Sequence, residues 1–246
     1  MENLSPRQIE ILKAIIIEYT HSGDPVGSEI LDKKYNLGVS PATVRNEMIE
    51  LAKKGHLKKE HFSSGRIPTP QAFRFYIKNI IKEKELSTAE EVSYKNDVWD
   101  FRNELHRLLQ QATRILAKKT SLLALTATNF GDIYYFGITN ILSQKEFLDI
   151  SLSKDFFSLF DEGLFCQSVL EQFKKIEEKI LFILGDEDFE GPRLETCASI
   201  FSDFAGEKVT GAIGVMGSKR MNYETVIPNV KYFAHLIEEI LKEKKL

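Results

Sequence analysis

The sequence of 246 residues has little of what marks a secreted, membrane-spanning or metal-binding protein. Its two cysteines, Cys166 and Cys197, lie far apart and form no Cys-x-x-Cys pair, so we expect neither a disulfide framework nor a zinc site. No apolar run approaches the ~18 residues of a membrane span. Residues 1–5 have neither the basic nor the apolar region of a signal peptide. These absences predict a reduced, cytoplasmic setting away from membranes.

The sequence also lacks the motifs of catalysis and cofactor binding. None of its five histidines has a metal-ligand spacing with another His or Cys, and neither Gly-x-Ser-x-Gly nor a P-loop occurs. The spacing of Gly211, Gly214 and Gly217 resembles a phosphate loop, but these glycines lie inside a strand pattern, where close backbone packing is the better interpretation. We therefore expect no enzyme, no catalytic residue, no cofactor and no metal.

Charge is unevenly distributed along the chain, whose net charge is −3. Residues 1–85 hold 14 Lys/Arg and 11 Asp/Glu, whereas residues 86–246 hold 19 and 25. Residues 53–84 alone hold nine Lys/Arg against two Asp/Glu. A basic zone in an otherwise acidic protein indicates a polyanionic partner at one end, although a solvated lysine surface would give the same pattern.

Residues 40–55 predict a short helix with a polar outer face. Ser40 is a good N-cap, Pro41 suits the first helical position and Gly55 suits a left-handed stop. Apolar residues at spacings of four and three predict one buried stripe: Val44, Met48 and Leu51. Arg and Asn side chains off this stripe can hydrogen-bond guanine and adenine edges. The residues that we expect to contact DNA bases are Ser40, Pro41, Ala42, Thr43, Arg45 and Asn46.

Two more helices are predicted before this one, from Pro6 to about His21 and from Ser28 to about Tyr35. The order helix, loop, helix, turn, helix fits a helix-turn-helix, which lays its last helix in the major groove of DNA. An ordinary three-helix bundle would show the same pattern. A predicted strand at 56–62 and a turn at 63–69 then form a basic hairpin. Such a wing contacts phosphates or the minor groove, here through Lys58, Lys59, Ser64 and Arg66.

The rest of the chain predicts a helix followed by a mixed layer of strands and helices. Residues 86–91 are typical of a linker, and apolar residues from Tyr94 to Ile115 follow an a/d pattern over about three heptads. This pattern fits a helix that packs within its own domain or close to a dimer interface. It also fits a free coiled coil. Strands are predicted at 121–128, 133–138, 180–184, 198–204 and 209–216, and helices within 143–160, at 169–178 and at 226–245.

Several long motifs occur in a fixed order along the chain. They are Gly-Asp-Pro-Val-Gly-Ser at 23–28, Leu-Gly-Val-Ser-Pro-Ala-Thr-Val-Arg-Asn-Glu-Met at 37–48, Ser-Gly-Arg-Ile-Pro-Thr at 64–69 and Phe-Arg-Phe-Tyr at 73–76, with further motifs at 135–147 and 211–223. Together they closely resemble the HrcA family, the heat-inducible transcription repressors of bacteria. The resemblance implies a winged helix that binds, as a homodimer, an inverted-repeat operator in double-stranded DNA upstream of chaperone genes. It also implies the GroEL chaperonin as a partner.

The sequence departs from the family pattern in two places. Ser218-Lys219 stands where the family usually has Pro-Thr, and residues 130–133 replace a long stretch that carries part of a GAF-like sheet and an inserted dimerisation domain. We therefore expect an α+β fold in a shortened member of the family. Its predicted parts are a winged-helix DNA-binding domain at 1–86, a linker and connecting helix at 87–120, and a reduced GAF-like regulatory or dimerisation domain at 121–246.

Three functions fit this organisation. The first is a DNA-binding repressor of heat-shock (chaperone) genes. The second is a winged-helix regulator that senses a small molecule through a pocket in the GAF-like domain. The third is an interaction module whose winged helix binds protein.

Overall fold

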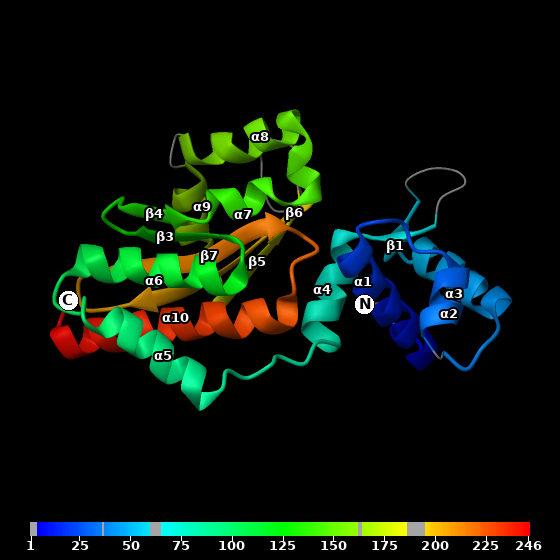
Figure 1. Cartoon of the computed structure of the whole chain (residues 1–246), viewed down its shortest axis with the longest axis horizontal. Coiled ribbons are helices and arrows are strands. Elements are labelled where there is room, and N and C mark those ends of the chain that lie inside the picture. The colour runs from blue at the N-terminus through cyan, green and yellow to red at the C-terminus, as the bar shows by residue number, and fades with distance from the viewer. Residues whose placement is uncertain (1–3, 36, 60–64, 162–163, 186–194) are drawn as a thin grey trace. The chain divides into compact units, whose positions relative to one another are not determined.

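The computed structural model describes residues 4–35, 37–59, 65–161, 164–185 and 195–246. The chain divides into two compact units, Met1–Lys82 and Glu83–Leu246 (Figure 1). Helices and antiparallel sheets occur together, so the predicted α+β class is confirmed. Among the described helices, none is long and apolar enough to cross a membrane.

The first unit consists of four helices and a small hairpin. Its elements in order are α1 (Pro6–Ser22), α2 (Ser28–Lys34), α3 (Pro41–Lys53), β1 (Leu57–Lys58), β2 (Ile67–Pro68) and α4 (Pro70–Asn79). Three of the helices begin alike, because Ser5, Ser40 and Thr69 each accept a hydrogen bond from the third helical N–H and are followed by proline. The side chains at the centre of this unit are at most 1% exposed: Ile11, Leu12, Ile15, Ile16, Leu31, Val44, Leu51 and Phe73.

The hairpin of this unit differs from the prediction. Residues 67–68, expected in a turn, form β2 and pair antiparallel with β1. The reason is burial, because Ile67 is only 7% exposed and its neighbour Arg66 exchanges two backbone hydrogen bonds with Val26, at 2.8 and 2.9 Å. Of the predicted strand at 56–62, residues 57–58 are β1, while residues 60–64 lie outside the described part of the chain.

The second unit is a five-stranded antiparallel sheet with helices on both faces (Figure 1). The sheet order is β4 (Ile133–Phe136), β3 (Leu123–Thr128), β7 (Thr210–Ser218), β6 (Cys197–Ala205) and β5 (Ile180–Leu184). On one face lie α5 (Thr88–Trp99), α6 (Leu105–Thr120) and α10 (Tyr223–Lys244). On the other lie α7 (Ile138–Leu142), η1 (Lys145–Leu148), α8 (Ile150–Asp161) and α9 (Leu164–Phe173). The predicted strands are all present, although Ile138 belongs to α7 rather than to a strand.

The single helix expected from Tyr94 to Ile115 is wrong. The chain forms α5 and α6 with a break at 100–104, and α5 begins inside the expected linker at a capping box between Ser87 and Glu90. The packing explains the break, because the Lys119 ammonium near the end of α6 lies 5.0 Å from the ring of Tyr94. In one continuous helix these two residues would be about 37 Å apart. The helix expected at 169–178 is also displaced, because α9 ends at Phe173.

The glycines of β7 confirm the prediction of close backbone packing. A Cβ at Gly214 would lie 2.2 Å from the carbonyl oxygen of Ile200, and one at Gly211 would lie 2.4 Å from that of Ala127. The rings of Phe201 and neighbouring Phe204 occupy the remaining space over these glycines. The spacing therefore serves the sheet and its aromatic cover rather than a phosphate.

Candidate nucleic-acid interface

The first turn and a half of α3 exposes polar side chains, while the opposite face of the helix is buried. Val44 and Leu51 are fully buried and Met48 is 4% exposed, so the opposite face points outward. The Ser40 hydroxyl accepts a hydrogen bond from the Thr43 backbone N–H at 3.2 Å and lies 3.0 Å from the Thr43 hydroxyl. The structure brings together all six residues expected to contact bases. Thr43 is half-buried and the others are exposed: Ser40, Pro41, Ala42, Arg45 and Asn46.

The two residues with the most hydrogen-bonding capacity on this face are Arg45 and Asn46. Within the described residues, neither side chain makes a hydrogen bond or an ion pair, so their donors and the Asn46 carbonyl are available to a ligand. Ile49, one turn further along α3, is 39% exposed and extends the same face. Ile49 was not among the residues expected to contact DNA, although its spacing of four from Arg45 and three from Asn46 was the available signal.

The outward face is held in place by contacts between α3 and α1. The Gln8 amide donates to Glu47 Oε2 at 3.1 Å, and Arg7 lies 3.9 Å from the same carboxylate. Lys54, just after α3, donates to Gln8 Oε1 at 3.0 Å. Because Gln8 is 8% exposed and bonded on both sides, it fixes how α3 is turned about its axis.

The preceding helix α2 is tied to α1 by a buried carboxylate. Glu18 is 6% exposed and accepts hydrogen bonds from Lys34 at 2.6 Å and from the Tyr35 hydroxyl at 3.3 Å. Burial and the neighbouring Glu18 carboxylate raise the pKa of Tyr35. The charged end of α2 is therefore anchored just before the turn that leads into α3.

The hairpin places the predicted wing residues beside the start of α4. Lys58 and Lys59 are exposed, and Arg66 is half-buried with its backbone paired to Val26. Gly65 lies so close to Val26 that a Cβ would sit 2.4 Å from the Val26 carbonyl oxygen. Ser64, the fourth residue expected in the wing, lies outside the described residues.

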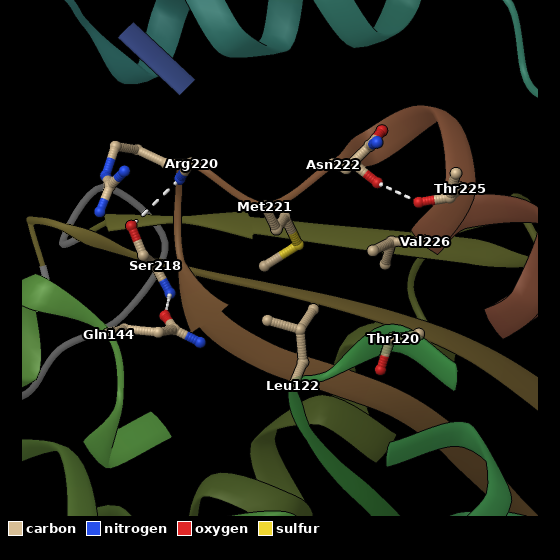
Figure 2. Close-up of a pocket in the computed structure, with 9 residues that line it drawn as sticks. All are labelled: Thr120, Leu122, Gln144, Ser218, Arg220, Met221, Asn222, Thr225 and Val226. Carbon is tan, nitrogen blue, oxygen red and sulfur yellow. Dashed lines mark hydrogen bonds between the residues drawn. The ribbon is translucent and has the colours of Figure 1, made fainter. Parts of the chain in front are cut away.

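A second candidate site is a cavity of ≈ 220 Å³ in the second unit (Figure 2). Its polar groups bond mainly to the protein itself. Gln144 Oε1 accepts from the Ser218 N–H at 2.8 Å, and the Thr225 hydroxyl donates to the Asn222 carbonyl at 3.1 Å. The lining residues are Thr120, Leu122, Gln144, Ser218, Arg220, Met221, Asn222, Thr225 and Val226.

An ion pair borders this cavity. The Arg220 guanidinium donates two hydrogen bonds to the Glu146 carboxylate, one of them at 2.9 Å, and the Ser218 hydroxyl donates a third at 2.8 Å. Burial raises the pKa of Glu146, but the hydrogen bonds from Arg220 and Ser218 outweigh it, and the net pKa is lowered. In the described ranges, no group of three or more His, Cys, Asp or Glu side chains could hold a metal ion.

The family model described as the HrcA protein C-terminal domain matches residues 40–227, which is most of the chain. The chain belongs to the HrcA family. A heat-inducible transcription repressor HrcA of Ruminiclostridium cellulolyticum is 26% identical to this HrcA-family chain over 343 residues, which cover 97% of this chain and 98% of the relative. That of Clostridium perfringens strain 13 is 40% identical over 120 residues, covering 48% of this chain and 35% of the relative.

The alignment lengths show that this HrcA-family chain is a shortened member. An alignment over 343 residues cannot be filled by a chain of 246, so the relatives carry a substantial stretch that is missing here. A crystal structure of a hypothetical protein shares the fold with a TM-score of 0.75 at 18% identity, over 98% of this chain and 99% of that one.

Proposed function

We propose that this HrcA-family chain is a transcription repressor of heat-shock genes that binds an inverted-repeat operator in duplex DNA as a homodimer. The observation that carries the proposal is the exposed face of α3, where Arg45 and Asn46 project from a helix anchored by a buried stripe. The heat-inducible transcription repressors to which the chain is similar support the regulatory role. On this proposal the chain is a regulator rather than an enzyme, and it acts in the cytoplasm.

In this proposal the first unit is a winged helix. The N-terminal half of α3 enters the major groove, where Arg45 hydrogen-bonds guanine and Asn46 hydrogen-bonds adenine. Ile49 lies further along the same face and contacts a thymine methyl group. The β1–β2 hairpin supplies positive charge to the phosphates or the minor groove through Lys58, Lys59, Ser64 and Arg66. Base contacts then give specificity, and hairpin contacts give affinity that depends on salt.

A matched pair of variants tests this division of roles. Arg45→Ala should cost about 1–3 kcal/mol on the operator and relax the preference at one position per half-site. Lys58→Ala should weaken binding to all sequences alike and lower the slope of log K against log salt by about 1. The measurement is DNA mobility shift at several salt concentrations on matched and mismatched duplexes. Identical behaviour of the two variants would contradict the proposed roles.

We propose that the second unit is a reduced GAF-like domain with a regulatory or dimerisation role. The cavity of ≈ 220 Å³ could suggest a small-molecule sensor, but its Gln144, Ser218 and Thr225 groups are already bonded within the protein. We therefore favour regulation through association with proteins, as the family's dependence on GroEL implies. Binding of purified GroEL to the chain, and its effect on operator binding, measures this directly.

A further inference from the structure

Exposed apolar side chains gather on one side of the second unit. Nine large hydrophobic side chains are exposed among the described residues, and five of them lie within residues 135–150. They belong to β4, α7, η1 and the first residue of α8. Their exposed fractions run from 40 to 72%, and we call them together the β4 patch: Tyr135, Ile138, Leu142, Leu148 and Ile150.

The residues of the β4 patch lie on adjoining elements. Tyr135 and Ile138 line one apolar hollow of ≈ 140 Å³, and the ring of Tyr135 lies 6.1 Å from that of Phe160 on α8. Leu142 follows Ile138 by four residues and so shares its face of α7. Because α7 and α8 both pack against η1, Leu148 at the end of η1 and Ile150 at the start of α8 lie on elements that adjoin α7.

Among the described strands, the patch borders an edge of the sheet. The strand β4 is the last in the order β4-β3-β7-β6-β5. The Thr128 N–H donates to the Asp132 carbonyl at 3.0 Å, so the backbone of Asp132 faces β3 at this position. By the alternation of antiparallel ladders, Tyr134 points its backbone groups toward β3, while Ile133 and Tyr135 point theirs outward. Residues 133–144 carry no charged side chain to protect this edge from pairing.

The outward groups of β4 suit a second copy of the same strand. In an antiparallel pair about a twofold axis at Tyr134, Ile133 of each copy lies opposite Tyr135 of the other, and their backbone groups match. Along β4 and α7 the absence of charged side chains removes the repulsion that two identical charged edges would suffer, and the charged Lys145 and Asp149 follow only in η1 and just before α8. The opposite edge strand, β5, has no exposed residue and offers no such surface.

The area of the patch fits a dimer contact. At these exposed fractions, and taking roughly 150–200 Å² for each large apolar side chain, the five residues expose on the order of 500 Å². A stable interface buries about 800 Å² on each partner. The patch therefore supplies more than half of that area before the strand edges are counted, and it lies near the upper limit for a monomer surface.

We propose that the β4 patch is the surface through which two copies of this chain associate, with their β4 strands paired antiparallel. The choice of a second copy rests in part on the proposed function, because an inverted repeat requires a twofold pair of α3 helices. The geometry gives each protomer the same contacts and extends the sheet from five strands to ten.

The test uses the full chain and light scattering after size exclusion over a range of concentrations. The double variant Leu148→Lys/Ile150→Lys changes two side chains that are each 72% exposed, so the fold should be unaffected, as circular dichroism checks. It should weaken dimerisation at least tenfold. Val92→Lys on α5 is the matched control, because Val92 is 53% exposed and outside the patch, and it should leave the dimer intact.

Hydrogen exchange provides a second readout at the backbone. The amides of Ile133 and Tyr135 should be protected in concentrated wild-type protein and should lose that protection on dilution to the monomer. Protection that does not depend on concentration would overturn the β4 pairing even if the chain dimerises. A wild-type dimer that survives the double variant would also overturn it, as would a wild-type monomer whose patch binds only a chaperonin.

Measuring DNA binding of both proteins separates the failure of the interface from the failure of the proposed function. The double variant should bind a half-site duplex with wild-type affinity and lose its advantage on the inverted repeat. If the patch carries the dimer but neither protein binds DNA specifically, the proposed function fails while the interface stands. If both proteins bind the inverted repeat equally well as dimers, the interface fails while the function stands.

Discussion

The contact between the hairpin and the segment before α2 gives the sharpest prediction from the structure. Substituting Ala for Gly65 places a Cβ 2.4 Å from the Val26 carbonyl oxygen, 2.5 Å from its carbon and 2.9 Å from the Gly27 nitrogen. All three are backbone atoms, so no side-chain rotation relieves the clash. Gly65→Ala should therefore push the hairpin away from Val26.

The expected loss of stability follows from the hydrogen bonds that this displacement breaks. Two backbone hydrogen bonds join Val26 and Arg66, and each contributes about 0.5–1.5 kcal/mol. Overpacking against backbone adds about 1–3 kcal/mol. Because part of the strain is relieved when the bonds break, we expect Gly65→Ala to lower the free energy of unfolding of the first unit by about 2–4 kcal/mol. It should also weaken DNA binding, since Arg66 moves with the hairpin.

The assay is hydrogen exchange at the amides of Val26 and Arg66, together with thermal unfolding followed by circular dichroism. The matched control is Gly27→Ala, because a Cβ at Gly27 meets nothing within 4 Å and the residue has φ −97°. As Gly27 caps α2 without a side chain, this control should cost less than about 1 kcal/mol. Wild-type protection of both amides in Gly65→Ala would refute the reasoning.

Three further predictions concern single side chains. Glu146→Ala leaves the half-buried Arg220 without its carboxylate and should cost about 2–3 kcal/mol in urea unfolding. Because folding lowers the pKa of Glu146 from 4.5, the stabilisation is present above pH 4.5 and is lost as pH falls through the folded-state value, and Glu146→Gln should flatten that acid limb. Gln8→Ala should cost about 1–2 kcal/mol, measured by thermal unfolding, through its lost bonds to Glu47 and Lys54. Ile49→Ser should cost roughly 1 kcal/mol at one thymine position, measured by competition between duplexes.

Local signals were sufficient to predict most elements of the fold. The cap at Ser40 set the start of its helix correctly, because a cap depends only on residues within one turn. The strands of the large sheet were also predicted, since buried strands read as short apolar runs. The turn at Gly131 in the β3–β4 hairpin, with φ +86°, was not predicted, although a glycine between two apolar runs is the signal for such a turn.

The errors arose where distant contacts decide the structure. The apolar spacing from Tyr94 to Ile115 fits one helix, and the contacts of Tyr94 with Lys119 and with Phe233, whose ring centroid lies 5.2 Å away, explain why α5 folds back. The strand β2 likewise depends on Val26, which is forty residues from Arg66 in the chain. Ile49 was overlooked because an apolar side chain on a helix is normally assigned to the core, and its exposure is visible only in three dimensions.

The most direct test of the central claim is selection of DNA from a random pool by the purified chain, followed by sequencing. The account predicts an enriched inverted repeat for the wild type, and for Arg45→Ala the same symmetry with one position per half-site relaxed. Enrichment of no sequence by a folded chain, or of a motif unchanged by Arg45→Ala, would contradict the claim that α3 reads the bases.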